Sequence, residues 1–168
     1  MITPGEALGQ LLPSYRRYYD VSEAPHGSFA ATARFYTRGE QYFLIRSAKM
    51  WEMESNEYVY FLTADALTTE QLQQRIEEAW SDTMPQVRPS ESHRNSDVTL
   101  VVLVPQLDAQ TRKALRHFHR SVGYRHGLHG WSNLRLGAIE LSDGRITTNR
   151  HGADLKKLLG NINLFIGE

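Results

Sequence analysis

Several residue types and patterns are missing from this 168-residue sequence, and each absence removes a class of protein. There is no cysteine, which excludes disulfide bonds, cysteine-based zinc sites and thiol chemistry. There is no net charge, because 19 Lys and Arg balance 19 Asp and Glu, so a histone-like protein and an acidic tail are both excluded. No apolar run exceeds five residues, against the ~20 needed to cross a bilayer. The N-terminal residues also lack the basic and then apolar regions of a signal peptide, so we expect a cytoplasmic protein with no membrane partner.

The common motifs of phosphate binding and nucleophilic catalysis are missing as well. Neither G-x-G-x-x-G nor G-x-x-x-x-G-K-S/T occurs, and there is no G-x-S-x-G. The sequence therefore assigns no catalytic residue and no cofactor, and it favours a non-catalytic protein.

Hydrophobic periodicity and turn signals predict the elements of one domain over residues 1–168. Helices are expected after the capping boxes of Thr3 with Glu6 and Thr68 with Gln71, and Pro13 is expected to kink or divide the first of them. A third helix should begin after Asp108 and run to Val122, and a short one should close the chain at 154–159. Strands are expected at 28–37, 41–46, 57–63, 97–104, 133–141 and 145–148, with turns at 54–56 and 142–144 and loops at 84–96 and 123–131.

One of these strands differs from the others. Residues 97–104 are apolar on both faces, which is typical of a central strand with helices above and below it. Short turns between the first three strands predict an antiparallel meander. Together the pattern predicts an α/β (α+β) domain with a mixed sheet, a doubly buried central strand and helices on both faces.

This order of elements loosely resembles restriction-endonuclease-like folds, which begin with a helix, three strands and a second helix. The resemblance would imply a metal-dependent nuclease, whose signature places an acid-x-Lys triplet on a strand. No strand expected here carries that triplet, so the resemblance transfers no active residue.

Charge is distributed unevenly along the chain. Residues 109–139 contain no Asp or Glu, whereas residues 52–91 are strongly acidic. At 100° per residue, the cations of the helix after Asp108 share its outer face, and the loop that follows adds more. We therefore expect a basic surface for phosphate or nucleic acid, formed by Arg112, Arg116, His119, Arg120, Arg125, His126 and His129.

Two other interpretations of the charges and histidines stay open. The basic and acidic regions can face each other, within one chain or across a homodimer of a structural protein. Glu52, Glu54 and Glu57 can hold Mg²⁺ beside phosphate in a metal-dependent nuclease or phosphodiesterase, but an exposed acidic hairpin tip explains them more simply. His126 and His129 match no zinc signature, so no metal site is assigned.

Overall fold

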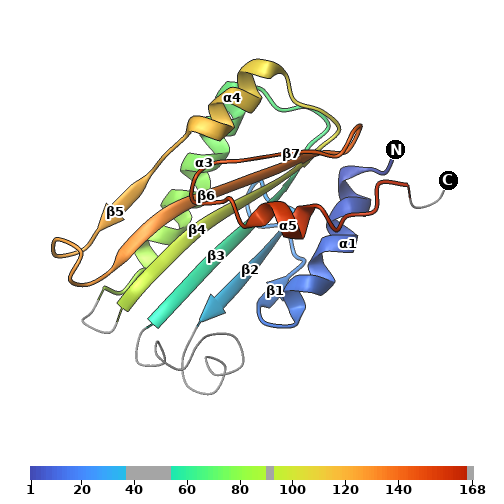
Figure 1. Ribbon diagram of the computed structural model, residues 1–168. Coiled ribbons are helices and arrows are strands. Elements are labelled where there is room, and N and C mark those ends of the chain that lie inside the picture. The colour runs from blue at the N-terminus through green and yellow to red at the C-terminus, as the bar shows by residue number, and fades with distance from the viewer. Residues whose placement is uncertain (37–53, 90–92, 166–168) are drawn as a thin grey trace.

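The computed structural model describes residues 1–36, 54–89 and 93–165. Its main feature is a mixed seven-stranded sheet in the order β1-β2-β3-β4-β6-β5, with β7 pairing the same edge of β6 as β5 (Figure 1). The elements in chain order are α1 (Pro4–Arg16), β1 (Asp20–Ser22), β2 (Ala31–Tyr36), β3 (Glu54–Thr63), α3 (Thr69–Thr83), the 3-10 turn η2 (Met84–Gln86), β4 (His93–Val104), α4 (Ala109–His117), β5 (Ser121–Gly123), β6 (Trp131–Glu140), β7 (Arg145–Thr148) and α5 (Leu155–Leu159).

The strand directions confirm the mixed α/β sheet. Strands β1, β2 and β3 are antiparallel neighbours, whereas β3, β4 and β6 run parallel to one another. Strand β4 lies in the middle, and every residue from Val98 to Val104 is fully buried, so the expected doubly buried central strand is confirmed. The strand expected at 41–46 lies outside the described residues.

Helices cover both faces of the sheet, as the sequence predicts. Even-numbered strand residues such as Leu100 and Leu134 face α3 and α4, and odd-numbered residues such as Phe61 and Val101 face α1 and α5. Figure 1 shows α1 and α5 in front of the sheet and α3 behind it. Because side chains alternate along a strand, each strand contributes to two separate cores.

Helix α1 is continuous through Pro13, because its buried stripe, which includes Leu8, Leu11 and Tyr15, packs against the sheet on both sides of the proline. Two local expectations are wrong. Residues 54–56 belong to β3 and not to a turn. Strand β4 begins at His93, within the stretch expected to be a loop.

The helix after Asp108 is also shorter than expected. It ends at His117, since Phe118 adopts an extended backbone conformation (φ −68°, ψ 127°) and the chain then pairs with β6. Phe118 still packs against the core, but Val122 lies on the exposed strand β5. The predicted binding residues after His117 therefore lie on the segment that joins α4 to β5 and on the loop that follows β5.

Candidate functional site

Arg112, on α4, is held by an ion pair inside the molecule. Its Nε and Nη2 donate to the Glu140 carboxylate at 2.9 and 2.8 Å, and Glu140 also accepts from the Leu107 N–H at 2.9 Å. Burial raises the pKa of the Glu140 carboxyl, but these three bonds outweigh burial and hold that pKa below its usual value. Arg112 therefore neutralises a buried carboxylate.

Arg120 and His119, which follow α4, also have partners within the chain. Arg120 donates to Glu77 on α3 and lies over the Trp80 ring, 4.5 Å from its centroid. The rings of His119 and His151 stack at 5.2 Å, and burial together with the nearby His119 lowers the pKa of His151. The Arg120–Glu77 ion pair joins the basic region to the acidic region within one chain. This agrees with the interpretation that the two regions face each other.

The loop between β5 and β6 presents Arg125 and His126 to solvent. Both residues have positive φ angles, 46° and 55°, which are uncommon for residues other than glycine. Backbone bonds hold the loop in this form, among them those from the N–H groups of residues 127 and 129 to the Tyr124 carbonyl, each at 3.0 Å. Backbone hydrogen bonds thus keep Arg125 and His126 in an uncommon, strained backbone conformation at the tip of the hairpin.

Trp131 lies against this loop and stays 47% exposed. A Cβ atom added at Gly123 would lie 2.6 Å from Cζ3 of the indole, and one added at Gly127 would lie 2.7 Å from its Cζ2. Only glycine leaves room for the ring at these positions. Leu128 is 77% exposed on the same loop, so cationic and apolar side chains occur together at the tip.

The seven predicted ligand-binding residues therefore do not form one cluster. Arg112, His119 and Arg120 contact other side chains of the protein, and Arg116 is exposed on α4. Strand β5 separates α4 from the loop that carries Arg125, His126 and the half-buried His129 (Figure 1). Their role in ligand binding stays a prediction.

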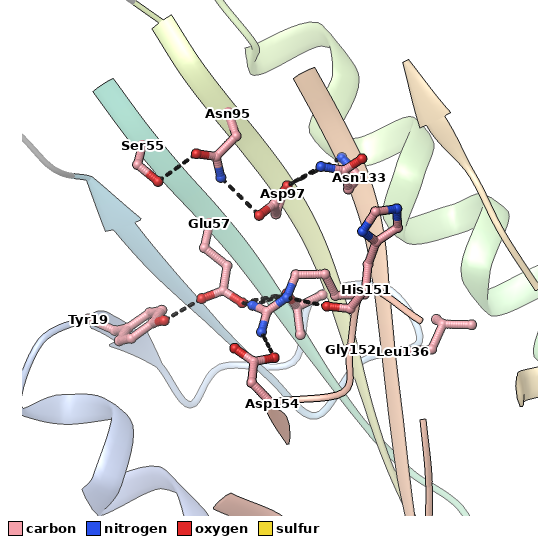
Figure 2. A network of polar contacts seen from close by, with 12 residues as sticks. Tyr19, Ser55, Glu57, Asn95, Asp97, Asn133, Leu136, His151, Gly152 and Asp154 are labelled. Carbon is pink, nitrogen blue, oxygen red and sulfur yellow. Dashed lines mark hydrogen bonds and ion pairs between the residues drawn. The ribbon is translucent and has the colours of Figure 1, made fainter. Parts of the chain in front are cut away.

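A second concentration of charge, which the sequence did not reveal, lies on the face of the sheet covered by α1 and α5. Glu57 on β3 is buried and accepts hydrogen bonds from Tyr19, Thr99 and Arg135, and it forms an ion pair with Arg135 (Figure 2). Arg135 on β6 also donates to the exposed Asp154. The expectation of an exposed acidic hairpin tip is wrong for Glu57, because an odd-numbered residue of β3 points to this inner face.

Polar side chains continue this network toward the N-terminal ends of the parallel strands (Figure 2). Ser55 donates to Asn95 at 2.8 Å, Asn95 donates to Asp97 at 2.9 Å, and Asn133 donates to Asp97 through its backbone N–H at 3.3 Å. The pKa of Asp97 is raised to about 6, because burial and, to a smaller extent, Glu57, its neighbour in register on β3, outweigh the lowering effect of Arg135. Asp97 is thus a carboxyl that titrates near neutral pH.

The loop before α5 is fixed to β6 by Asn149, which places His151 and Asp154 beside Arg135. The buried Asn149 side chain accepts from the N–H groups of Leu136 and Gly152, each at 2.9 Å, and donates to the Leu134 carbonyl at 2.9 Å. A Cβ atom at Gly152 would collide with the Leu136 backbone, so this close approach requires glycine. The His151 carbonyl then accepts from Arg135 Nε at 3.2 Å.

A cavity of about 240 Å³ opens where this charged network meets the two helices. Its walls combine carboxylates, tyrosine rings and leucine side chains, contributed by Ser14, Tyr15, Tyr19, Glu57, Arg135, Asp154, Leu155 and Leu158. Arg135 is the cation of this lining, and Glu57 and Asp154 are its two carboxylates.

No metal centre is evident in the part of the chain that the structure describes. Its residues include no group of three or more His, Asp or Glu side chains that could hold a metal ion. Glu52 lies outside the described residues, so the magnesium interpretation stays a prediction. Asp154 and Lys156 do have acid-x-Lys spacing, but they lie at the start of α5 and not on a strand.

Comparisons with known proteins give one match. A family model described as a domain of unknown function (DUF8052) matches residues 4–161. No curated protein and no solved structure matches the chain. In the described ranges, none of the helices has the length and apolar character needed to cross a bilayer.

Proposed function

We propose that this chain, which belongs to the DUF8052 family, is a non-catalytic binding module for nucleic acid or a similar phosphate-bearing ligand, acting in the cytoplasm. The observation that carries the proposal is the tip of the β5–β6 hairpin. It combines the exposed guanidinium of Arg125 and the exposed imidazole of His126 with the exposed indole of Trp131. Arg116 adds a further exposed cation on α4.

Cations and an aromatic ring together suit single-stranded nucleic acid. The cations attract phosphate groups, and a base stacks on the open face of an indole. The loop backbone supports the other side of the Trp131 ring, so the ring is already positioned before a ligand arrives. The strain at Arg125 and His126 is of the kind that persists at functional sites.

The role of the predicted cations differs from what the sequence alone indicates. Arg112 and Arg120 neutralise Glu140 and Glu77, so they contribute little free charge to a ligand. With few phosphate contacts, affinity should be weak and should fall as salt is added. These contacts go to the backbone of the nucleic acid, so little sequence preference is expected.

Fluorescence anisotropy of a short labelled oligothymidylate, at two salt concentrations, tests the proposal. Trp131→Ala should weaken binding by about tenfold, the typical loss of one base stacking contact. Arg125→Glu should also weaken binding and reduce its salt dependence. Arg145→Glu, an exposed cation on β7, is the matched control and should leave binding unchanged.

Two results would contradict this proposal. An affinity that does not depend on salt concentration, or that is unchanged in both Trp131→Ala and Arg125→Glu, would exclude the hairpin tip as the binding surface. Absence of binding to single-stranded and double-stranded probes would favour the structural alternative, a homodimer, which sedimentation at several protein concentrations would detect.

A further inference from the structure

The cavity beside Arg135 is separate from the hairpin tip and differs from it in charge. It lies between the end of α1, the start of α5 and the strands β3 and β6. Its volume of about 240 Å³ is below the roughly 300–1,000 Å³ that is usual for drug-sized ligands. A ligand that fits has only a few heavy atoms.

The charges around the cavity are not balanced. Two carboxylates, Glu57 and Asp154, line it against the single guanidinium of Arg135, and Asp97 on β4 is the neighbour of Glu57 in register. The guanidinium is already occupied, since it donates to both carboxylates, to the Thr99 hydroxyl and to the His151 carbonyl. An anionic ligand would have to displace Asp154 from Arg135, whereas a cationic ligand would compensate the excess negative charge.

Tyr15 provides independent evidence that this cavity suits a ligand with a hydrogen-bond donor. Its side chain is only 4% exposed, yet within the described part of the chain its hydroxyl has no hydrogen-bond partner. Glu57, Arg135 and Asp154 all influence the pKa of this hydroxyl, and burial raises it most. The hydroxyl therefore faces the charged side of the cavity, where it can accept a hydrogen bond from a bound molecule.

The remaining walls define the rest of the ligand. Leu155 and Leu158 give an apolar side, and the rings of Tyr15 and Tyr19 meet edge to face at 4.9 Å. Tyrosine rings attract cations through their faces, and leucine side chains suit a short hydrocarbon chain. Tyr19 donates to Glu57, which fixes the carboxylate at the cavity wall.

We infer that this cavity is a binding site for a small organic cation, an aliphatic primary amine whose ammonium group contacts Tyr15, Glu57 and Asp154. The ammonium donates to the Tyr15 hydroxyl and to the carboxylates, and the alkyl chain lies along Leu155 and Leu158. Arg135 is a positioning residue, because it donates hydrogen bonds to both carboxylates and fixes them at the cavity wall. Polyanion binding at the hairpin tip does not depend on this site.

Ligand-observed NMR with three probes of equal length tests the inference on the full chain. Butylamine, charged at neutral pH, should bind, 1-butanol should bind at least about tenfold more weakly because it lacks the charge, and butyrate should not bind. Chemical-shift changes in the intact protein should place butylamine near Leu155 and Leu158. Preferential binding of butyrate would show that Arg135 is the anchor and would overturn the inference, as would absence of binding by all three probes.

Two variants make the test specific to the cavity. Tyr15→Phe removes the hydroxyl but keeps the ring that contacts Phe61. It should weaken the binding of butylamine by about tenfold, because one hydrogen bond to a charged group is lost. Asp154→Asn should also weaken binding, and this side chain is 76% exposed, so folding should be unaffected. Tyr18→Phe and Asp143→Asn, at exposed positions outside the cavity lining, are the matched controls. Equal binding by all four variants would overturn the inference.

Discussion

Replacing Arg135 with methionine should strongly destabilise the protein, because it leaves carboxylates without a counter-charge. Glu57 is buried against Arg135, and the raised pKa of Asp97 shows that burial already disfavours a second negative charge nearby. Removing one partner of a buried ion pair costs about 3–5 kcal/mol. That is a large part of a typical stability of about 5–15 kcal/mol.

Urea and thermal unfolding of Arg135→Met measure this cost. For a chain of this length the loss corresponds to a fall in Tm of about 6–20 °C. The double variant Arg135→Met with Glu57→Met should recover most of the loss, because both charges are then replaced by apolar groups of similar length.

The loss should also depend on pH. Arg135 lowers the pKa of Asp97, so without Arg135 the folded-state pKa of Asp97 rises further above its unfolded value, and the folded protein binds protons more readily than the unfolded chain. The variant is therefore relatively more stable at low pH, and its deficit grows as pH rises toward 8. A cost below about 1 kcal/mol, typical of an exposed pair, or a cost independent of pH, would refute the account of a desolvated network.

Three further predictions concern single groups. Asp97 has a folded pKa of about 6 against roughly 3.9 unfolded, so its contribution to stability should rise as pH falls from 7 to 4, and urea unfolding series should show that Asp97→Asn removes this contribution relative to the wild type. His119→Gln should raise the pKa of His151 toward its usual value, because the variant removes a neighbouring ring whose electrostatic effect lowers that pKa; an NMR titration of His151 measures it, and an unchanged value would contradict the contact between the two rings. Val101→Asp should abolish folding, since it places an unpaired charge at a fully buried position of β4; a folded variant by circular dichroism would contradict the central position of that strand.

Local sequence signals predicted the elements whose causes are themselves local. The capping boxes at Thr3 and Thr68 and the cap at Asp108 all form as expected, since each depends on residues three positions apart. The central strand was also identified from a local signal, because apolar and polar residues do not alternate along residues 98–104. The helix end at Phe118 was missed, because Val122 continues the helical spacing and only pairing with β6 draws it into β5.

The charged network was missed because its partners are distant in the sequence. Glu57 contacts Tyr19 and Arg135 across 38 and 78 residues, and no local pattern identifies such pairs. A weaker signal was present, since Thr99 and Arg135 are polar residues whose two neighbours in the sequence are apolar. Their convergence with Glu57 also requires the register of three parallel strands, which depends on the crossover connections and not on any one segment.

The arrangement of polar and apolar residues on this face of the sheet argues that the network serves more than stability. Residues farther along the same strands, such as Phe61 and Val101, are apolar and lie under α1 and α5. The strand positions at Glu57, Thr99 and Arg135 could continue that apolar face, and well-packed apolar residues usually stabilise a fold at least as well as a buried ion pair. The sheet instead changes from apolar to charged where the cavity opens, and the Tyr15 hydroxyl, for which the described residues provide no hydrogen-bond partner, lies at that boundary. Buried charge at the wall of a cavity is expected where a ligand supplies the missing partner.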